Sequence, residues 1–125
     1  MHQTKDGGYI VACSSESNDG DVSGNHGSED FWVIKLDASG KIIWQKSLGG
    51  SAWDEVHDIR QTTDGGYIVA GMTSSNNGDV KGFHGDVDLW VIKLDPNGAI
   101  LWQKALGGLG FDEAFGIQQT KNGEY

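Results

Sequence analysis

The chain repeats itself at a spacing of 58 residues, and this duplication limits the folds that it can adopt. Residues 3–60 align with residues 61–118 without a gap, and 35 of the 58 positions are identical. A third copy begins at residue 119 and continues to residue 125. Duplication at such a period indicates stacked supersecondary units, because each unit needs a neighbour to bury its apolar surface.

Each repeat is expected to contain short strands separated by turns. In the second repeat, one strand runs from Tyr67 to about Thr73, a stretch rich in aromatic and β-branched residues. The next two run from about Asp88 to Leu94 and from about Ala99 to Ala105. Turn residues separate them at Asp64–Gly66 and Asp95–Gly98, where glycine and proline set the required backbone angles.

The fourth strand of the repeat is expected over about Asp54 to Thr62. Alternation would place His57, Ile59 and Gln61 on one face of this strand. The same stretch also reads as an amphipathic helix with acidic residues in its first turn. Gly116, in the matching part of the second copy, disfavours a helix by ~1 kcal/mol, so we predict a strand.

Four antiparallel strands with apolar residues on both faces indicate an all-β fold of stacked blades, because each sheet needs cover on two sides. The segments DGGYIVAG, WVIKLDPNGAILWQK and LGGLGFDEAFGIQQT resemble the repeats of exported bacterial β-propeller-like proteins. The pattern D-x-W-V-I-K-L-D-x-x-G-x-I-x-W is also similar to quinoprotein-type propeller blades. The resemblance implies one blade over residues 3–60, a second over 61–118, and the start of a third over 119–125. It also implies an extracellular or cell-surface parent protein, but no activity, because propellers host unrelated functions.

The chain is out of phase with its blades, which predicts self-association. Propellers have ~4–8 blades, and two repeats do not close a ring. The strand expected over residues 54–62 is the first strand of the second blade, and the first blade lacks such a strand of its own. The matching stretch at about residues 111–120 lacks a following strand with which to pair. We therefore expect head-to-tail assembly into a ring, with a trimer giving six blades or a tetramer giving eight. The alternative is a fragment, or an engineered piece, of a longer propeller, which the overlap of residues 3–9 with 119–125 favours.

Composition excludes several partner classes. The net charge is −9 and the sequence pI is about 4.6, so nucleic acid and anionic membrane surfaces are not expected partners. No apolar run approaches the ~20 residues that insert into a bilayer, and no signal peptide is visible. Cys13 is the only cysteine, so no internal disulfide forms.

The loop SNDGDVSGNHGSED, residues 17–30, has the oxygen spacing of an EF-hand calcium loop. In its copy, Asn77 takes the first ligand position and Lys81 another, and a strand follows instead of a helix. A true EF-hand is therefore not expected, and a looser structural calcium site competes with ordinary loop hydrogen bonding. The candidate ligands for such a site are Asp19, Asp21, Asp30, Asp79 and Asp88.

Histidine and tryptophan positions give further candidates. His26 and His84 recur in the two loops, and each is expected to hydrogen-bond within its loop. The four tryptophans that recur with the repeat are expected to fill space between blades. Trp53 matches Phe111 in the connection between repeats, where we expect the most exposed of the five tryptophans. Trp53 and Phe111 are the candidate residues for stacking on a sugar ligand.

No catalytic constellation is evident. Neighbouring acids, such as Asp54 and Glu55, point to opposite faces of a strand and form no dyad by themselves. Neither a G-x-S-x-G nucleophile motif nor a phosphate-binding lysine pattern occurs. We expect a non-enzymatic structural or binding scaffold, without a cofactor apart from the candidate calcium. The alternatives are a lectin-like propeller with one weak site per blade and, less favoured, a hydrolase with a site across the ring. Expected partners are further copies of the chain and a glycan or protein ligand.

Overall fold

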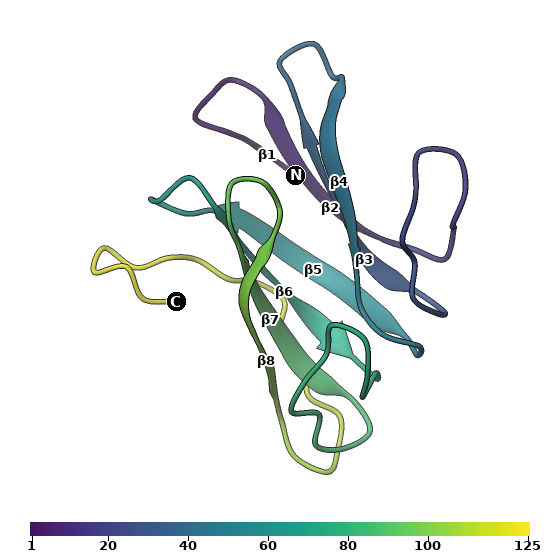
Figure 1. The fold of residues 1–125 in the computed structure, drawn as a ribbon. Helices are drawn as coiled ribbons and strands as arrows, with labels where there is room; N and C mark the ends of the chain where they lie inside the picture. Colours follow the sequence, from purple (N-terminus) through teal and green to yellow (C-terminus); the bar gives the residue numbers. More distant parts are fainter.

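The computed structural model describes residues 1–125 and is all-β, with two four-stranded antiparallel sheets and no helix (Figure 1). The first sheet has the order β1-β2-β3-β4, with β1 at His2–Gln3, β2 at Tyr9–Ser15, β3 at Asp30–Leu36 and β4 at Ile42–Leu48. The second has the order β5-β6-β7-β8, with β5 at Asp54–Gln61, β6 at Tyr67–Thr73, β7 at Asp88–Leu94 and β8 at Ile100–Leu106. No segment forms a helix that could span a membrane. The predicted fold class, two sheets of four antiparallel strands, is confirmed.

The strand predictions hold closely for the second repeat. Strands β6 and β7 have the predicted bounds, and the fourth strand, β5, is a strand instead of a helix. Strand β8 begins at Ile100, one residue later than predicted. The pairing of β7 with β8 is irregular between Lys93 and Leu94, because Leu94 lies opposite Ile100 while Lys93 lies opposite Trp102.

Of two predictions about the ends of the sheets, one holds in part and one is wrong. The first sheet has only the end of the expected strand before β2, since His2 and Gln3 alone pair with Ile10 and Tyr9. Residues 111–120, predicted as a strand, form none. A strand needs a neighbour for its backbone hydrogen bonds, and within this chain no β2-like strand follows them. These residues instead lie along the second sheet on the side away from the first sheet (Figure 1).

The predicted common face of His57, Ile59 and Gln61 is also wrong. The pairing of β5 with β6 shifts between Val56 and Asp58, where a bulge inserts one residue. Ile59 is 1% exposed and belongs to the core between the sheets. His57 stacks on Phe115 at 5.2 Å and donates from Nδ1 to the Ala114 carbonyl, which places it on the opposite face.

The Asp-Gly-Gly turns are fastened to the sheets by buried lysines. Gly65 has φ +85°, a conformation that glycine adopts without strain. A Cβ on Gly66 would lie 2.3 Å from the Leu94 carbonyl oxygen and 2.6 Å from Lys93 Nζ, so the close approach of the backbone here requires glycine. Lys93 is 4% exposed and donates to Thr62 Oγ1 at 3.0 Å and Asp64 Oδ1 at 3.1 Å. The first repeat builds the same turn with Lys35, so each repeat is locally complete.

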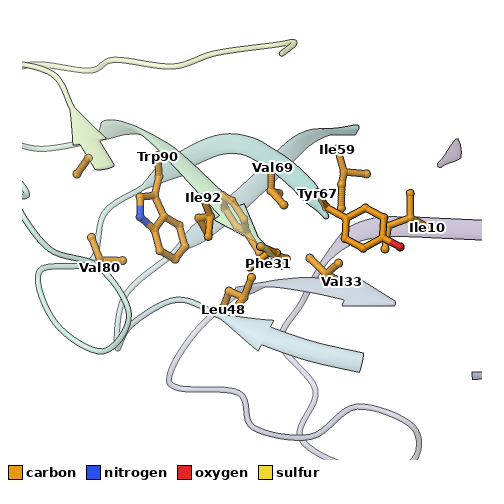
Figure 2. Packing of buried hydrophobic residues seen from close by; sticks show 12 residues of the cluster. Ile10, Phe31, Val33, Leu48, Ile59, Tyr67, Val69, Val80, Trp90 and Ile92 are labelled. Carbon is orange, nitrogen blue, oxygen red and sulfur yellow. The ribbon is translucent and has the colours of Figure 1, made fainter. Parts of the chain in front are cut away.

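The hydrophobic core lies between the two sheets (Figure 2). Phe31 of the first sheet packs on Trp90 of the second, with ring centroids 4.9 Å apart. Trp44 meets the edge of Tyr67 at 5.8 Å and donates from Nε1 to the Pro96 carbonyl at 3.2 Å. We call this packing the inner interface. It consists of the β2–β4 face of the first sheet covered by the β5–β7 face of the second sheet.

Candidate functional site

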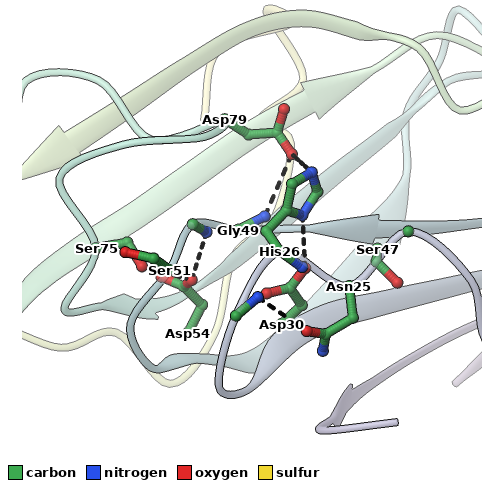
Figure 3. A network of polar contacts seen from close by, with 12 residues as sticks. Asn25, His26, Asp30, Ser47, Gly49, Ser51, Asp54, Ser75 and Asp79 are labelled. Carbon is green, nitrogen blue, oxygen red and sulfur yellow. Dashed lines mark hydrogen bonds and ion pairs between the residues drawn. The ribbon is translucent and has the colours of Figure 1, made fainter. Parts of the chain in front are cut away.

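A polar network lies at the loop end of the inner interface (Figure 3). His26 places its backbone N and Nδ1 at 3.0 and 2.7 Å from Asp30 Oδ2. His84 makes the same pair with Asp88, with Nδ1 2.9 Å from Oδ2. The prediction that each histidine hydrogen-bonds locally is confirmed. In both copies the aspartate is the first residue of a strand, so the contact fastens the preceding loop to the sheet.

Asp54 is the most fully bonded carboxylate of the network. Its Oδ1 accepts a hydrogen bond from the Thr73 hydroxyl, and its Oδ2 accepts from Ser75 Oγ at 2.9 Å and Gly50 N at 2.8 Å. Asp54 is 0% exposed, and burial raises its pKa against the opposing effect of these donors. The cluster joins the start of β5 to the end of β6 and to the loop that follows β6. The cluster therefore stabilises the positions of these segments relative to one another.

A second buried carboxylate approaches Asp54 across Gly49. A Cβ on Gly49 would lie 2.6 Å from Asp54 Oδ2 and 2.7 Å from Asp30 Oδ1, so a larger residue would push the carboxylates aside. Asp30 Oδ1 is buried and has no hydrogen-bond partner. The nearby charge of Asp30 adds to the rise in the pKa of Asp54. The second repeat places Asp88 Oδ1, also without a partner, in the same relation to Gly107.

The candidate calcium ligands are spread over several places. Asp19 and Asp21 are exposed on the loop between β2 and β3, whereas Asp30 and Asp88 are buried beside histidines. Asp79 crosses the inner interface, where its Oδ2 accepts from Gly49 N at 3.3 Å and lies 3.8 Å from His26 Nε2. No group of three or more histidine, cysteine or acidic side chains comes together to hold a metal ion. Calcium binding at these residues stays a prediction.

The candidate sugar-stacking residues occupy unlike environments. Trp53 is half-buried and donates from Nε1 to Glu29 Oε2 at 2.8 Å, while Phe111 is 59% exposed. The prediction that Trp53 is the most exposed tryptophan is wrong, because Trp102 is exposed and Trp53 is not. Trp102 lies on a sheet face that no second sheet covers, a difference that its sequence surroundings do not reveal.

The second sheet has an apolar face that no other sheet covers. We call it the lower outer face and define it by Leu89, Val91, Trp102 and Leu106. Trp102 is 38% exposed and Leu106 46%. A groove of about 380 Å³ separates this face from the C-terminal segment, residues 111–125. Tyr125 of that segment meets the edge of Trp102 at 5.8 Å.

The first sheet also has an uncovered face, on its side away from the core. We call it the upper outer face and define it by Tyr9, Val11, Trp32 and Leu36, all half-buried. Trp32 donates from Nε1 to Gln45 at 2.8 Å, as Trp90 donates to Gln103 at 2.7 Å in the inner interface. The tryptophan of the uncovered face therefore makes the same hydrogen bond as its covered counterpart.

Neither a protein-family model nor a curated protein matches this chain. The two outer faces and the carboxylate cluster are therefore the features from which we infer a function. Sequence reasoning predicted self-association but named no residue of either face, although the repeat contains that information, because each face duplicates one side of the inner interface.

Proposed function

We propose that the chain is a non-enzymatic scaffold module whose sheets act as consecutive propeller blades, and that copies join head to tail into a closed ring. The observation that carries this proposal is the inner interface, in which a β2–β4 face covers a β5–β7 face (Figure 2). The lower and upper outer faces repeat those two surfaces at opposite ends of the molecule. Contact between unlike faces closes a ring when the rotation allows, with three copies giving six blades and four giving eight.

The lower outer face matches the covered face of the first sheet. Leu106 stands where Leu48 stands, and Trp102 where Trp44 stands. Leu48 is 4% exposed under the second sheet, whereas Leu106 is 46% exposed. Covering this face would remove apolar surface from water, which stabilises association by roughly 25 cal/mol per Å² of buried apolar area before the costs of association.

The C-terminal segment indicates how the lower outer face would receive a second copy. Tyr125 lies 5.8 Å from Trp102 in an edge contact, the same separation as Tyr67 from Trp44. Tyr9 is the residue of the upper outer face at the position of Tyr67. We therefore expect Tyr9 of a second copy to take the place of Tyr125.

Matched sequence changes support the same junction. Across the inner interface, Asn77 accepts from Ser51 N at 2.8 Å and donates to Ser51 Oγ at 2.9 Å. At a junction between copies, Asp19 would replace Asn77 and Leu109 would replace Ser51. Aspartate keeps the acceptor and lacks the donor, and leucine has no hydroxyl to receive one. The two changes are therefore compatible with each other.

The test is the oligomeric state of this chain, measured by native mass spectrometry and light scattering at micromolar concentration. We expect a trimer or a tetramer, and a monomer would contradict the proposal. Leu106→Asp should convert the assembly to monomers, because it places a charge in the junction. Leu101→Asp is the matched control. Its counterpart Ile43 stays 55% exposed although the first sheet is covered, so Leu101 should stay exposed in the ring.

A further inference from the structure

The hydrogen-bonded cluster around Asp54 recurs as two separated halves at opposite ends of the molecule. Asp112, the counterpart of Asp54, accepts only the amide bond, from Gly108 N at 2.8 Å. The counterparts of the two hydroxyls are Ser15 and Ser17, and Ser17 N donates to Ser15 Oγ at 3.1 Å. The complete cluster has the same arrangement, with 3.0 Å between the corresponding atoms. One end thus holds a carboxylate without hydroxyls, and the other holds hydroxyls without a carboxylate.

The strand edge beside those serines is mostly unpaired. Strand β6 pairs with β5 along its whole length, Tyr67–Thr73. Strand β2 pairs with β1 only at Tyr9 and Ile10, so its edge from Val11 to Ser15 has no neighbour. Unpaired backbone N–H and C=O groups on such an edge are a template for an added strand.

Residues 112–117 correspond to the part of β5 that this edge lacks. They match residues 54–59 of β5, and both stretches begin with Asp-Glu and end with isoleucine. Within the chain these residues form no strand. The two positions that follow in β5, residues 60–61, correspond to β1 at the N-terminus. The unpaired edge and β1 therefore leave room for a strand of the length of residues 112–117.

We propose that residues 112–117 of one copy add as a strand to the edge Val11–Ser15 of the next copy. This inference rests on the proposed head-to-tail assembly and names its register. By the pairing of β5 with β6, Asp112 lies opposite Ser15, and Ile117 lies opposite Val11. The Asp112 carboxylate then accepts the hydroxyl hydrogen bonds of Ser15 and Ser17, which completes the cluster across the junction.

The same register makes residues 118–125 surplus at the junction. They align with residues 2–9 of the next copy, so the two stretches compete for one position. Within one chain, Gln119 accepts from Thr63 N at 2.9 Å, as Gln61 accepts from Lys5 N at 2.9 Å. Assembly therefore displaces residues 118–125, and Gln3 of the incoming copy takes the place of Gln119.

Cysteine cross-linking tests the register. Two variants lacking the native thiol are mixed, Cys13→Ala with Val11→Cys and Cys13→Ala with Ile117→Cys, and then oxidised. Paired positions have Cβ atoms about 4.5–5.5 Å apart, close to the reach of a disulfide. We expect a disulfide-linked dimer in the mixture and none in either variant alone. Gly116→Cys in place of Ile117→Cys is the control, because adjacent residues of the added strand point to opposite faces.

Two further measurements separate this inference from the proposed function. Removal of residues 118–125 should leave the oligomer at least as stable to dilution. Asp112→Ala should weaken assembly by about tenfold or more, whereas its exposed neighbour, changed as Glu113→Ala, should have little effect. An oligomer that forms, gives no cross-link and tolerates Asp112→Ala would contradict strand addition but not the ring proposal. A chain that stays monomeric would overturn both.

Discussion

The covered face of the first sheet and the lower outer face of the second sheet have nearly the same sequence and opposite surroundings. Phe31, Trp44 and Leu48 of the first lie against the second sheet, whereas Leu89, Trp102 and Leu106 face a groove and the C-terminal segment. Phe31 is 0% exposed and Leu48 4%, but Leu106 is 46% exposed. Burial at these positions thus depends on whether a neighbouring sheet is present.

This difference explains why one repeat is not a self-sufficient unit. The turns are complete within each repeat, because Lys35 and Lys93 make the same contacts in both. The apolar faces are complete only where two repeats meet, as at Phe31 and Trp90. Stacked architectures generally divide their stability in this way between local units and the interfaces between neighbours.

The largest expected difference between the two faces concerns folding stability. Phe31→Ala should destabilise the chain by about 3–5 kcal/mol, because it opens a cavity in the core. Leu89→Ala, at the matching position, should cost about 1 kcal/mol or less, because its site lacks a packed neighbour. Urea unfolding at a concentration where the chain is monomeric measures both. Equal losses of stability for the two variants would contradict the expectation that only the covered face stabilises the monomer.

A smaller difference is expected between the two carboxylate clusters. Asp54→Ala should destabilise the monomer by about 2 kcal/mol, because it leaves the Thr73 and Ser75 hydroxyls and the Gly50 amide without their acceptor. Asp112→Ala should change monomer stability by no more than about 0.5 kcal/mol, since its cluster is incomplete. Thermal unfolding of dilute samples distinguishes the two, and a large loss for Asp112→Ala would show that its half-cluster already stabilises the fold.

The smallest effect is expected at the turns, where the two repeats should behave alike. Hydrogen bonds from Thr4 and Thr62, followed by those from the lysines and turn amides, lower the pKa of Asp6 and Asp64 from 3.8 to about 2. A lowered pKa means that the carboxylate stabilises the folded state above pH 3.8, and that this contribution is lost as the pH falls towards 2.

Melting temperatures between pH 5 and pH 2 test this expectation. Asp6→Asn and Asp64→Asn should each reduce the pH dependence by a similar small amount, because both carboxylates are exposed to solvent screening. Asp86→Asn, an exposed carboxylate without a hydrogen bond in the structure, should leave the pH dependence unchanged. Unequal effects of the first two variants would contradict the local completeness of the turns.

Much of the fold follows from local signals in the sequence. Strands β6 and β7 could be bounded because β-branched and aromatic runs end at glycine, proline and aspartate turns. The bulge in β5 could not be located, since it depends on how Val56 and Asp58 pair with β6. Residues 111–120 have a strand-like sequence but form no strand, because a strand needs a neighbouring strand for its backbone hydrogen bonds, and the local sequence does not show whether one is present.

The candidate sites divide in the same way. The local contacts of His26 and His84 could be predicted, because both partners lie four residues away in the sequence. The cluster around Asp54 could not, because Thr73 and Ser75 reach it from another strand and its following loop. The exposure of Trp102 and the partial burial of Trp53 were reversed in the prediction, since each depends on what covers the residue.

The sequence by itself determined the all-β class, the repeat, the turns and which side chains share a strand, because period and turn chemistry act over a few residues. Only the tertiary structure decided which of two nearly identical faces is buried, where β5 bulges, and which hydrogen-bond clusters are complete. Those outcomes depend on contacts between residues far apart in the chain, such as Phe31 with Trp90 and Asp54 with Thr73. Because the sequence is duplicated, each of the two sheet faces of the inner interface has a second copy on the outside of the molecule. The packing of one sheet on the other covers one copy of each face and leaves the other uncovered.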